Sequence, residues 1–170
     1  MMCVISSCPV IVVLLCGMLG EQQSPKFIEK TVRQNGLLLT VTLPTKAIAG
    51  SAVNIKIRLE NQSTDLVLYR HTGKYVDYNL ATVDAKGKSV ALTQFGKVVY
   101  GDARIIGGSG VVNKLQPGKY IESTVNVARV FDLSQDGVYT LGVTAIVKTR
   151  GDTIQLKVEK MMLAIEEEPR

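Results

Sequence analysis

Apolar residues recur at every second position along most of this chain, and this alternation is what most constrains its fold. In one run, polar or charged residues separate four apolar ones, Val53, Ile55, Ile57 and Leu59. The segment 139–147 repeats the pattern. Because successive side chains of a β-strand point to opposite faces, a period of two predicts strands with one buried face. Such runs follow one another from Leu37 to Ile165.

These runs predict an all-β fold. Short turn signals separate them, and no amphipathic helix longer than two turns interrupts them. We therefore expect an antiparallel, immunoglobulin-like β-sandwich of about 7–8 strands over residues 36–166. Residues 94–113 are rich in glycine and predict a long, irregular connection with one or two short strands.

Two local features refine this prediction. Gly137 precedes Tyr139 at the entry to a late strand, where a tyrosine corner would bond its hydroxyl to the preceding loop. Leu141 stands where an antibody-type domain has cysteine, and the chain has no tryptophan. Near Lys160 the apolar residues change phase, which predicts a β-bulge because one extra residue reverses the faces of a strand.

The first 20 residues form a separate segment. They contain no charged side chain, and 3–19 are mostly apolar. This pattern is typical of an export leader, expected to be helical, and it predicts a secreted, periplasmic or envelope-tethered protein. Cleavage after Gly20, retention as a membrane anchor and lipid attachment at Cys16 or Cys8 all remain open. Since Cys3 lies there too, a chain cut after Gly20 has no cysteine.

The flanking segments and the net charge do not indicate a specific binding or catalytic site. Residues 21–35 are polar and are interpreted as a linker, and 167–170 as a solvated tail. The net charge is +5, but the basic residues are scattered rather than clustered. This argues against nucleic acid as a partner and leaves membrane contact to the N-terminal segment.

A family resemblance rests on turn and corner motifs between residues 37 and 147. They are Ala49-Gly50-Ser51-Ala52-Val53, Leu59-Glu60-Asn61-Gln62-Ser63, Leu115-Gln116-Pro117-Gly118-Lys119, Phe131-Asp132-Leu133-Ser134 and Gly137-Val138-Tyr139-Thr140. This succession resembles the accessory N-terminal domain of deuterolysin-like metallopeptidases and the bacterial intracellular proteinase inhibitor domain. The HExxH zinc helix of the peptidases is absent from the sequence, so the resemblance implies a non-catalytic sandwich and, as an alternative function, proteinase inhibition.

Some residues suggest chemistry but have simpler interpretations. His71, the single histidine, could act as a base beside Asp77 or Asp65, yet nothing supplies a nucleophile, so a surface position at a strand end is favoured. Asp132 and Asp136, like the turn at Asp84, offer too few carboxylates for a calcium loop.

Three short motifs are likewise interpreted as turns. Arg150-Gly151-Asp152 matches an integrin-binding tripeptide, but a two-residue hairpin loop with positive φ at Gly151 is favoured. Asn61-Gln62-Ser63 matches a glycosylation sequon and also a turn after a strand. Gly107-Gly108-Ser109-Gly110 lacks the lysine of a phosphate loop and the last glycine of a nucleophile elbow. We predict no catalytic, cofactor-binding or metal-ligating residue, and no cofactor.

The sequence therefore predicts an exported, non-enzymatic binding module. Its expected partner is a protein or a cell-surface polymer, contacted by a strand edge or by residues 94–113, because sandwiches place binding residues on loops held by a rigid frame. The alternative is a proteinase inhibitor-type domain.

Overall fold

A computed structural model describes residues 26–101, 110–149 and 151–168. The expected leader helix, its cysteines and most of the glycine-rich motif at 107–110 lie outside these residues. Within them, no helix is long and apolar enough to cross a membrane.

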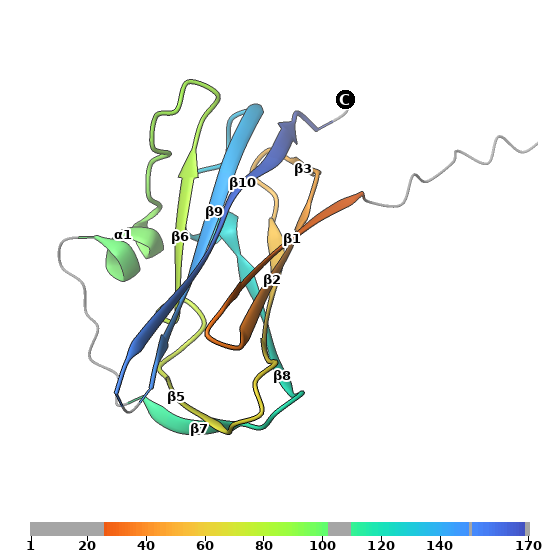
Figure 1. The fold of residues 1–170 in the computed structure, drawn as a ribbon. Helices are drawn as coiled ribbons and strands as arrows, with labels where there is room; N and C mark the ends of the chain where they lie inside the picture. Colours follow the sequence, from red (N-terminus) through yellow and green to blue (C-terminus); the bar gives the residue numbers. More distant parts are fainter. Residues whose placement is uncertain (1–25, 102–109, 150, 169–170) are drawn as a thin grey trace, which may run out of the picture.

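Two four-stranded sheets form the sandwich (Figure 1). The first has the order β1 (Phe27–Gln34), β2 (Leu37–Pro44), β4 (Asn54–Asn61) and β8 (Tyr120–Asn126). The second has the order β3 (Lys46–Ile48), β10 (Thr153–Glu166), β9 (Gly137–Lys148) and β6 (Tyr78–Val83). A smaller sheet pairs β5 (Val67–His71) with β7 (Val111–Leu115), and the helices are α1 (Gln94–Tyr100) and the 3₁₀ turn η1 (Val127–Arg129).

The all-β, immunoglobulin-like prediction is confirmed, although the described residues contain ten strands rather than the expected 7–8. All pairs are antiparallel except β3 with the end of β10. The alternating residues face the core as predicted. Ile55 and Ile57 of β4 and Leu141 and Val143 of β9 are buried between the two sheets. Burying each such side chain contributes about 1.5–3 kcal/mol.

The linker interpretation of residues 21–35 is wrong for its second half, which forms β1. Asn35 and Gly36 have φ of 50° and 74°, the backbone of a tight hairpin turn that leads into β2. The ammonium group of Lys30 donates to the carbonyls of Glu159 and Lys160, at 3.1 and 2.9 Å. β1 therefore closes the side of the sandwich by reaching from β2 to β10.

The predicted β-bulge and tyrosine corner are both confirmed. The register between β9 and β10 shifts between Val158 and Met161, and Lys160 has a φ of 56°. Val158 and Met161 can thus both face the core. The hydroxyl of Tyr139 donates to the carbonyl of Gln135 at 3.0 Å, which ties the entry of β9 to the loop before it.

The connection expected to be irregular at 94–113 begins instead with α1. Thr93 caps this helix, since its hydroxyl accepts a hydrogen bond from the amide of Gly96 at 3.0 Å. A Cβ at Gly96 would lie 2.1 Å from the carbonyl oxygen of Val130, so only glycine lets the helix pack this closely. The expected short strand of this region is β7.

Candidate binding cleft

The small β5–β7 sheet and the turn that joins β9 to β10 lie at the same end of the sandwich (Figure 1). Residues of both line a cleft. Its volume is about 570 Å³, within the range of pockets that hold small ligands or a few side chains of a partner. The lining residues are Leu68, Tyr69, Arg70, Val112, Lys148, Thr149, Gly151, Asp152 and Thr153. They come from three separate parts of the chain.

The register of the small sheet decides which side chains face the cleft. Arg70 pairs with Val112, so these two side chains share one face with Leu68. Tyr69 and Leu115 point the other way and are buried in the core, which fixes the sheet to the sandwich. Burial also raises the pKa of the Tyr69 phenol above its ordinary value, so that side chain is neutral at physiological pH.

The opposite wall is the β9–β10 turn. Lys148 and Thr153 are the last paired residues of the two strands, and Thr149 and Asp152 flank the two-residue loop that the sequence predicts. The amide of Thr149 donates to the carbonyl of Asp152 at 2.9 Å, and the Thr149 hydroxyl accepts from the Asp152 amide at 3.1 Å. Arg150 lies outside the described residues, so the structure does not test the integrin-binding tripeptide.

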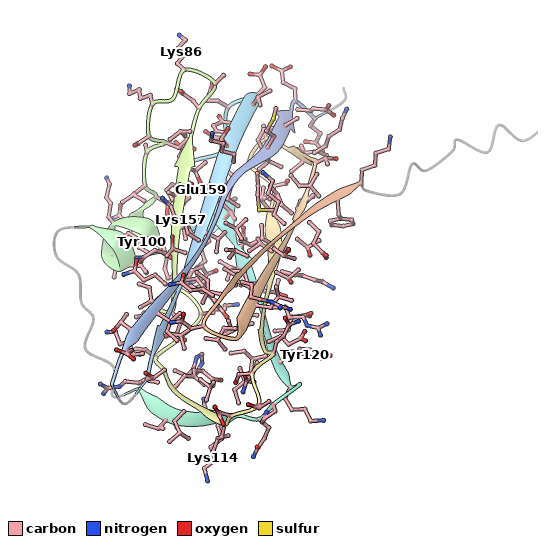
Figure 2. All side chains as sticks on the ribbon, viewed as in Figure 1. Lys86, Tyr100, Lys114, Tyr120, Lys157 and Glu159 are labelled. Carbon is pink, nitrogen blue, oxygen red and sulfur yellow. The ribbon has the colours of Figure 1, made fainter. Side chains whose placement is uncertain are left out.

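Positive charge dominates the described walls of the cleft. Arg70 and Lys148 are cationic, and Asp152 is the one carboxylate among the described lining residues. Lys114 is exposed on the same face of β7 and lies at this end of the molecule (Figure 2). A Cβ at Gly110 would lie 2.6 Å from Cγ of Arg70, so the glycine backbone packs directly on this side chain and helps to position it.

His71, at the end of β5, lies outside the cleft lining and pairs with Asp77. The distance from His71 Nδ1 to Asp77 Oδ2 is 2.5 Å. The other Asp77 oxygen accepts from the Thr72 amide at 3.0 Å, and Asp77 also accepts from the Gly73 amide at 3.4 Å. This carboxylate therefore closes the turn after β5. Among the described residues His71 makes no hydrogen bond to a hydroxyl side chain that could serve as a nucleophile.

The remaining candidates are turn residues. Asp84 accepts from the amides of Lys86 and Lys88, each at 2.9 Å. Asp132 accepts from the Ser134 amide at 3.2 Å, and hydrogen bonds from Ser134 hold the pKa of Asp132 below its ordinary value. The described part of the chain contains no group of three or more residues suited to bind a metal ion.

Asn61 is not available for glycosylation in the folded domain. Its side chain is fully buried, and its amide nitrogen donates to the carbonyls of Asp65 and Leu115, at 2.7 and 2.8 Å. Its oxygen accepts from the amide and the hydroxyl of Ser63, at 3.0 and 2.7 Å. The buried Asn61 side chain therefore anchors the turn after β4 to Leu115, at the end of β7.

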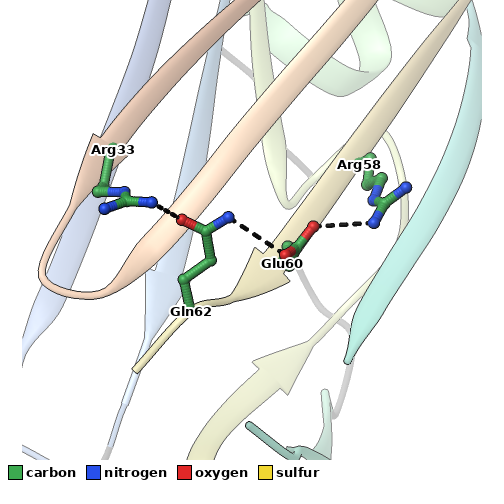
Figure 3. Close-up of polar contacts among 4 residues, drawn as sticks. All are labelled: Arg33, Arg58, Glu60 and Gln62. Carbon is green, nitrogen blue, oxygen red and sulfur yellow. Dashed lines mark hydrogen bonds and ion pairs between the residues drawn. The ribbon is translucent and has the colours of Figure 1, made fainter. Parts of the chain in front are cut away.

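Sequence reasoning missed a polar network on the outer face of the first sheet (Figure 3). Arg33 bonds to Gln62, whose amide nitrogen donates to Glu60 at 3.2 Å, and Arg58 donates to the other Glu60 oxygen at 2.8 Å. The guanidinium of Arg58 also lies 3.7 Å from the centre of the Tyr120 ring. The hydrogen bond from Gln62, followed by Arg58, lowers the pKa of Glu60. The network joins β1 to β4 and β8 and supports the sheet that carries them.

The chain matches no protein-family model and no curated protein sequence. Among solved structures it is similar to a β-glucosidase from Listeria innocua in complex with glucose, with 12% identity and a TM-score of 0.34. The gluconolactone complex of that enzyme gives 12% identity and a TM-score of 0.32. Each likeness covers 79% of this chain and 16% of the other, so the chain spans less than a fifth of the length of these enzymes. Similarity at this level supports no argument about activity.

Proposed function

We propose that this chain is an exported, non-enzymatic binding module that holds an anionic segment of a protein or cell-surface polymer in the cleft between β5–β7 and the β9–β10 turn. The observation that carries the proposal is the cleft itself, in which Arg70 and Lys148 outnumber the described carboxylate, Asp152. The uncharged leader at 1–20 supports export.

The backbone around the cleft is held in place on two sides, and this supports a role in binding. The floor of the cleft is a paired sheet whose other face is fixed in the core by Tyr69 and Leu115. The wall is a turn closed by hydrogen bonds between Thr149 and Asp152. Such a frame fixes the backbone positions of the two cations, so that only their exposed side chains have to be ordered when a ligand binds.

The sign of the charge selects the ligand class. Two cations line the cleft, Lys114 stands beside it, and the whole chain carries +5. A cleft of one predominant charge attracts oppositely charged partners and raises their association rate. Carboxylate-bearing polymers such as acidic peptides or polyuronates have this chemistry, and their binding should weaken as salt screens the charges.

Calorimetric titration of the full chain with poly-glutamate and with polygalacturonate tests the proposal. We expect Lys148→Glu to weaken binding of at least one polymer roughly 10-fold. Lys86→Glu is the matched control, because it makes the same charge change on an exposed turn far from Lys114 (Figure 2). Equal losses in both variants, or no binding by the unaltered chain, would refute the proposal. Inhibition of a protease panel that Lys148→Glu leaves unchanged would favour the proteinase inhibitor alternative.

A further inference from the structure

An apolar groove lies at the other end of the sandwich, where β1 begins and β10 ends. Its volume is about 330 Å³, and its lining is Ile28, Thr45, Val138, Lys160, Met162 and Ala164. Val138 pairs with Ala164 across β9 and β10, and β1 contributes Ile28 from the side. The groove shares no lining residue with the cleft in which we propose that the anionic partner binds.

Large apolar side chains around the groove are exposed to solvent. Met162 is 61% exposed and Val138 43%, although they belong to different strands. We call these two residues and the half-buried Ile28, which lines the groove beside them, the apolar patch. The β-bulge at Lys160 creates part of it, because it lets Met161 follow Val158 into the core and so turns Met162 outward. Clustered exposed apolar side chains of this kind mark interaction surfaces.

The position of the chain entry indicates what covers the patch. The described structure starts at Lys26, two residues before Ile28 in the patch. Only residues 21–25 separate this point from the uncharged segment 1–20. Fully extended, the chain from residue 20 to residue 26 spans at most about 20 Å. A leader retained in a bilayer would therefore hold this end of the domain close to the membrane surface.

We propose that the apolar patch lies against the lipid bilayer in which residues 1–20 are anchored, with Val138 and Met162 inserted at the level of the headgroups. Lys160 lines the groove beside the patch, and a lysine stem can lie along apolar surface while its ammonium group stays in water. Lys148, in the cleft, is ten residues along β9 from Val138, or about 33 Å. The cleft would thus face away from the membrane.

The chain has no tryptophan, so single substitutions give clean fluorescent reporters. The full chain, with its leader, is reconstituted into vesicles of phosphatidylcholine and phosphatidylglycerol that carry brominated acyl chains. We compare Met162→Trp with Val112→Trp, since Val112 is similarly exposed at 63% but lines the cleft at the other end. Bromine should quench Met162→Trp severalfold more strongly than Val112→Trp. Val138→Trp serves as a second patch reporter, and far-UV circular dichroism verifies folding.

Each outcome decides the proposal, which rests on leader retention but not on the proposed anionic ligand. Strong quenching at Met162 and Val138, and weak quenching at Val112, supports it. Equal quenching at all three positions, or failure of the full chain to float with the vesicles, overturns it. Protection of Met162→Trp from acrylamide by self-association in detergent, without lipid, would assign the patch to a second copy and also overturn it. The Lys148→Glu titration separately tests the anionic ligand.

Discussion

Replacing the amide of Asn61 by a carboxylate should be among the most damaging isosteric changes in this domain. The Asn61 side chain is 0% exposed, and its nitrogen donates to the carbonyls of Asp65 and Leu115. In Asn61→Asp an oxygen takes the place of this nitrogen, so two hydrogen bonds become contacts between oxygen atoms. The bonds from Ser63 to the other oxygen can persist.

The expected magnitude follows from the cost of unsatisfied buried groups. Each buried polar group left without a partner costs about 1–3 kcal/mol, and a buried charge adds to this. We therefore expect Asn61→Asp to lower the free energy of unfolding by about 3–5 kcal/mol near neutral pH. Since small domains are stable by only about 5–15 kcal/mol, this is a large fraction of the total.

The pH dependence gives this prediction a distinctive signature. Burial and the two facing carbonyls should raise the folded-state pKa of the new carboxyl group above its unfolded value of about 3.9. A protonated carboxyl can donate one hydrogen bond, so the folded state binds the proton more tightly. The variant should thus be most stable below the unfolded pKa and lose stability as pH rises through the folded pKa.

Equilibrium urea unfolding, followed by circular dichroism between pH 4 and pH 7.5, measures both effects. Asn54→Asp is the matched control, because Asn54 lies on the same strand but is exposed, and it should change stability by less than about 0.5 kcal/mol. If Asn61→Asp and Asn54→Asp lose similar stability, or if the deficit of Asn61→Asp does not shrink toward acidic pH, the buried amide does not have the role assigned to it.

Two further substitutions test the packing. Gly96→Ala would place a Cβ 2.1 Å from the carbonyl oxygen of Val130 and should cost about 2 kcal/mol or more in urea unfolding. Gly151→Ala is the control, because a Cβ there meets open space and should cost much less, and equal effects would contradict this packing. Tyr139→Phe removes only the hydroxyl that bonds to Gln135 and should cost about 1 kcal/mol at unchanged core packing, so an unchanged unfolding midpoint would argue against the tyrosine corner.

The parts of the fold that depend on local pattern could be predicted. The period of two located the buried faces of β4 and β9, and a phase change in the sequence was sufficient to predict the bulge at Lys160. β1 was missed because an edge strand buries few side chains: only Ile28 and Val32 are partly buried. The pair Asn35-Gly36 was the available signal, since Asn-Gly is typical of tight hairpin turns.

The candidate cleft could not be predicted, because its walls depend on contacts between distant residues. Arg70 and Lys148 are far apart in the sequence, and neither belongs to a recognisable motif. They line one cleft only because β5 pairs with β7 at the same end of the sandwich as the β9–β10 turn. The role of Asn61 was hidden for the same reason, since one of its acceptors is the carbonyl of Leu115.

The two proposed surfaces sit at opposite ends of one strand, and this arrangement has a functional consequence. β9 runs from Val138 in the apolar patch to Lys148 in the cleft, and its pairing with β10 and β6 makes it a central strand of its sheet. A central, paired strand opens locally only at a high cost in free energy, so we expect it to keep one conformation when either end is bound. Bilayer contact and ligand binding should therefore be energetically independent, and substitutions at Met162 and Lys148 should have additive effects. Strong coupling between them would mean that the domain does not act as the rigid spacer that this geometry implies.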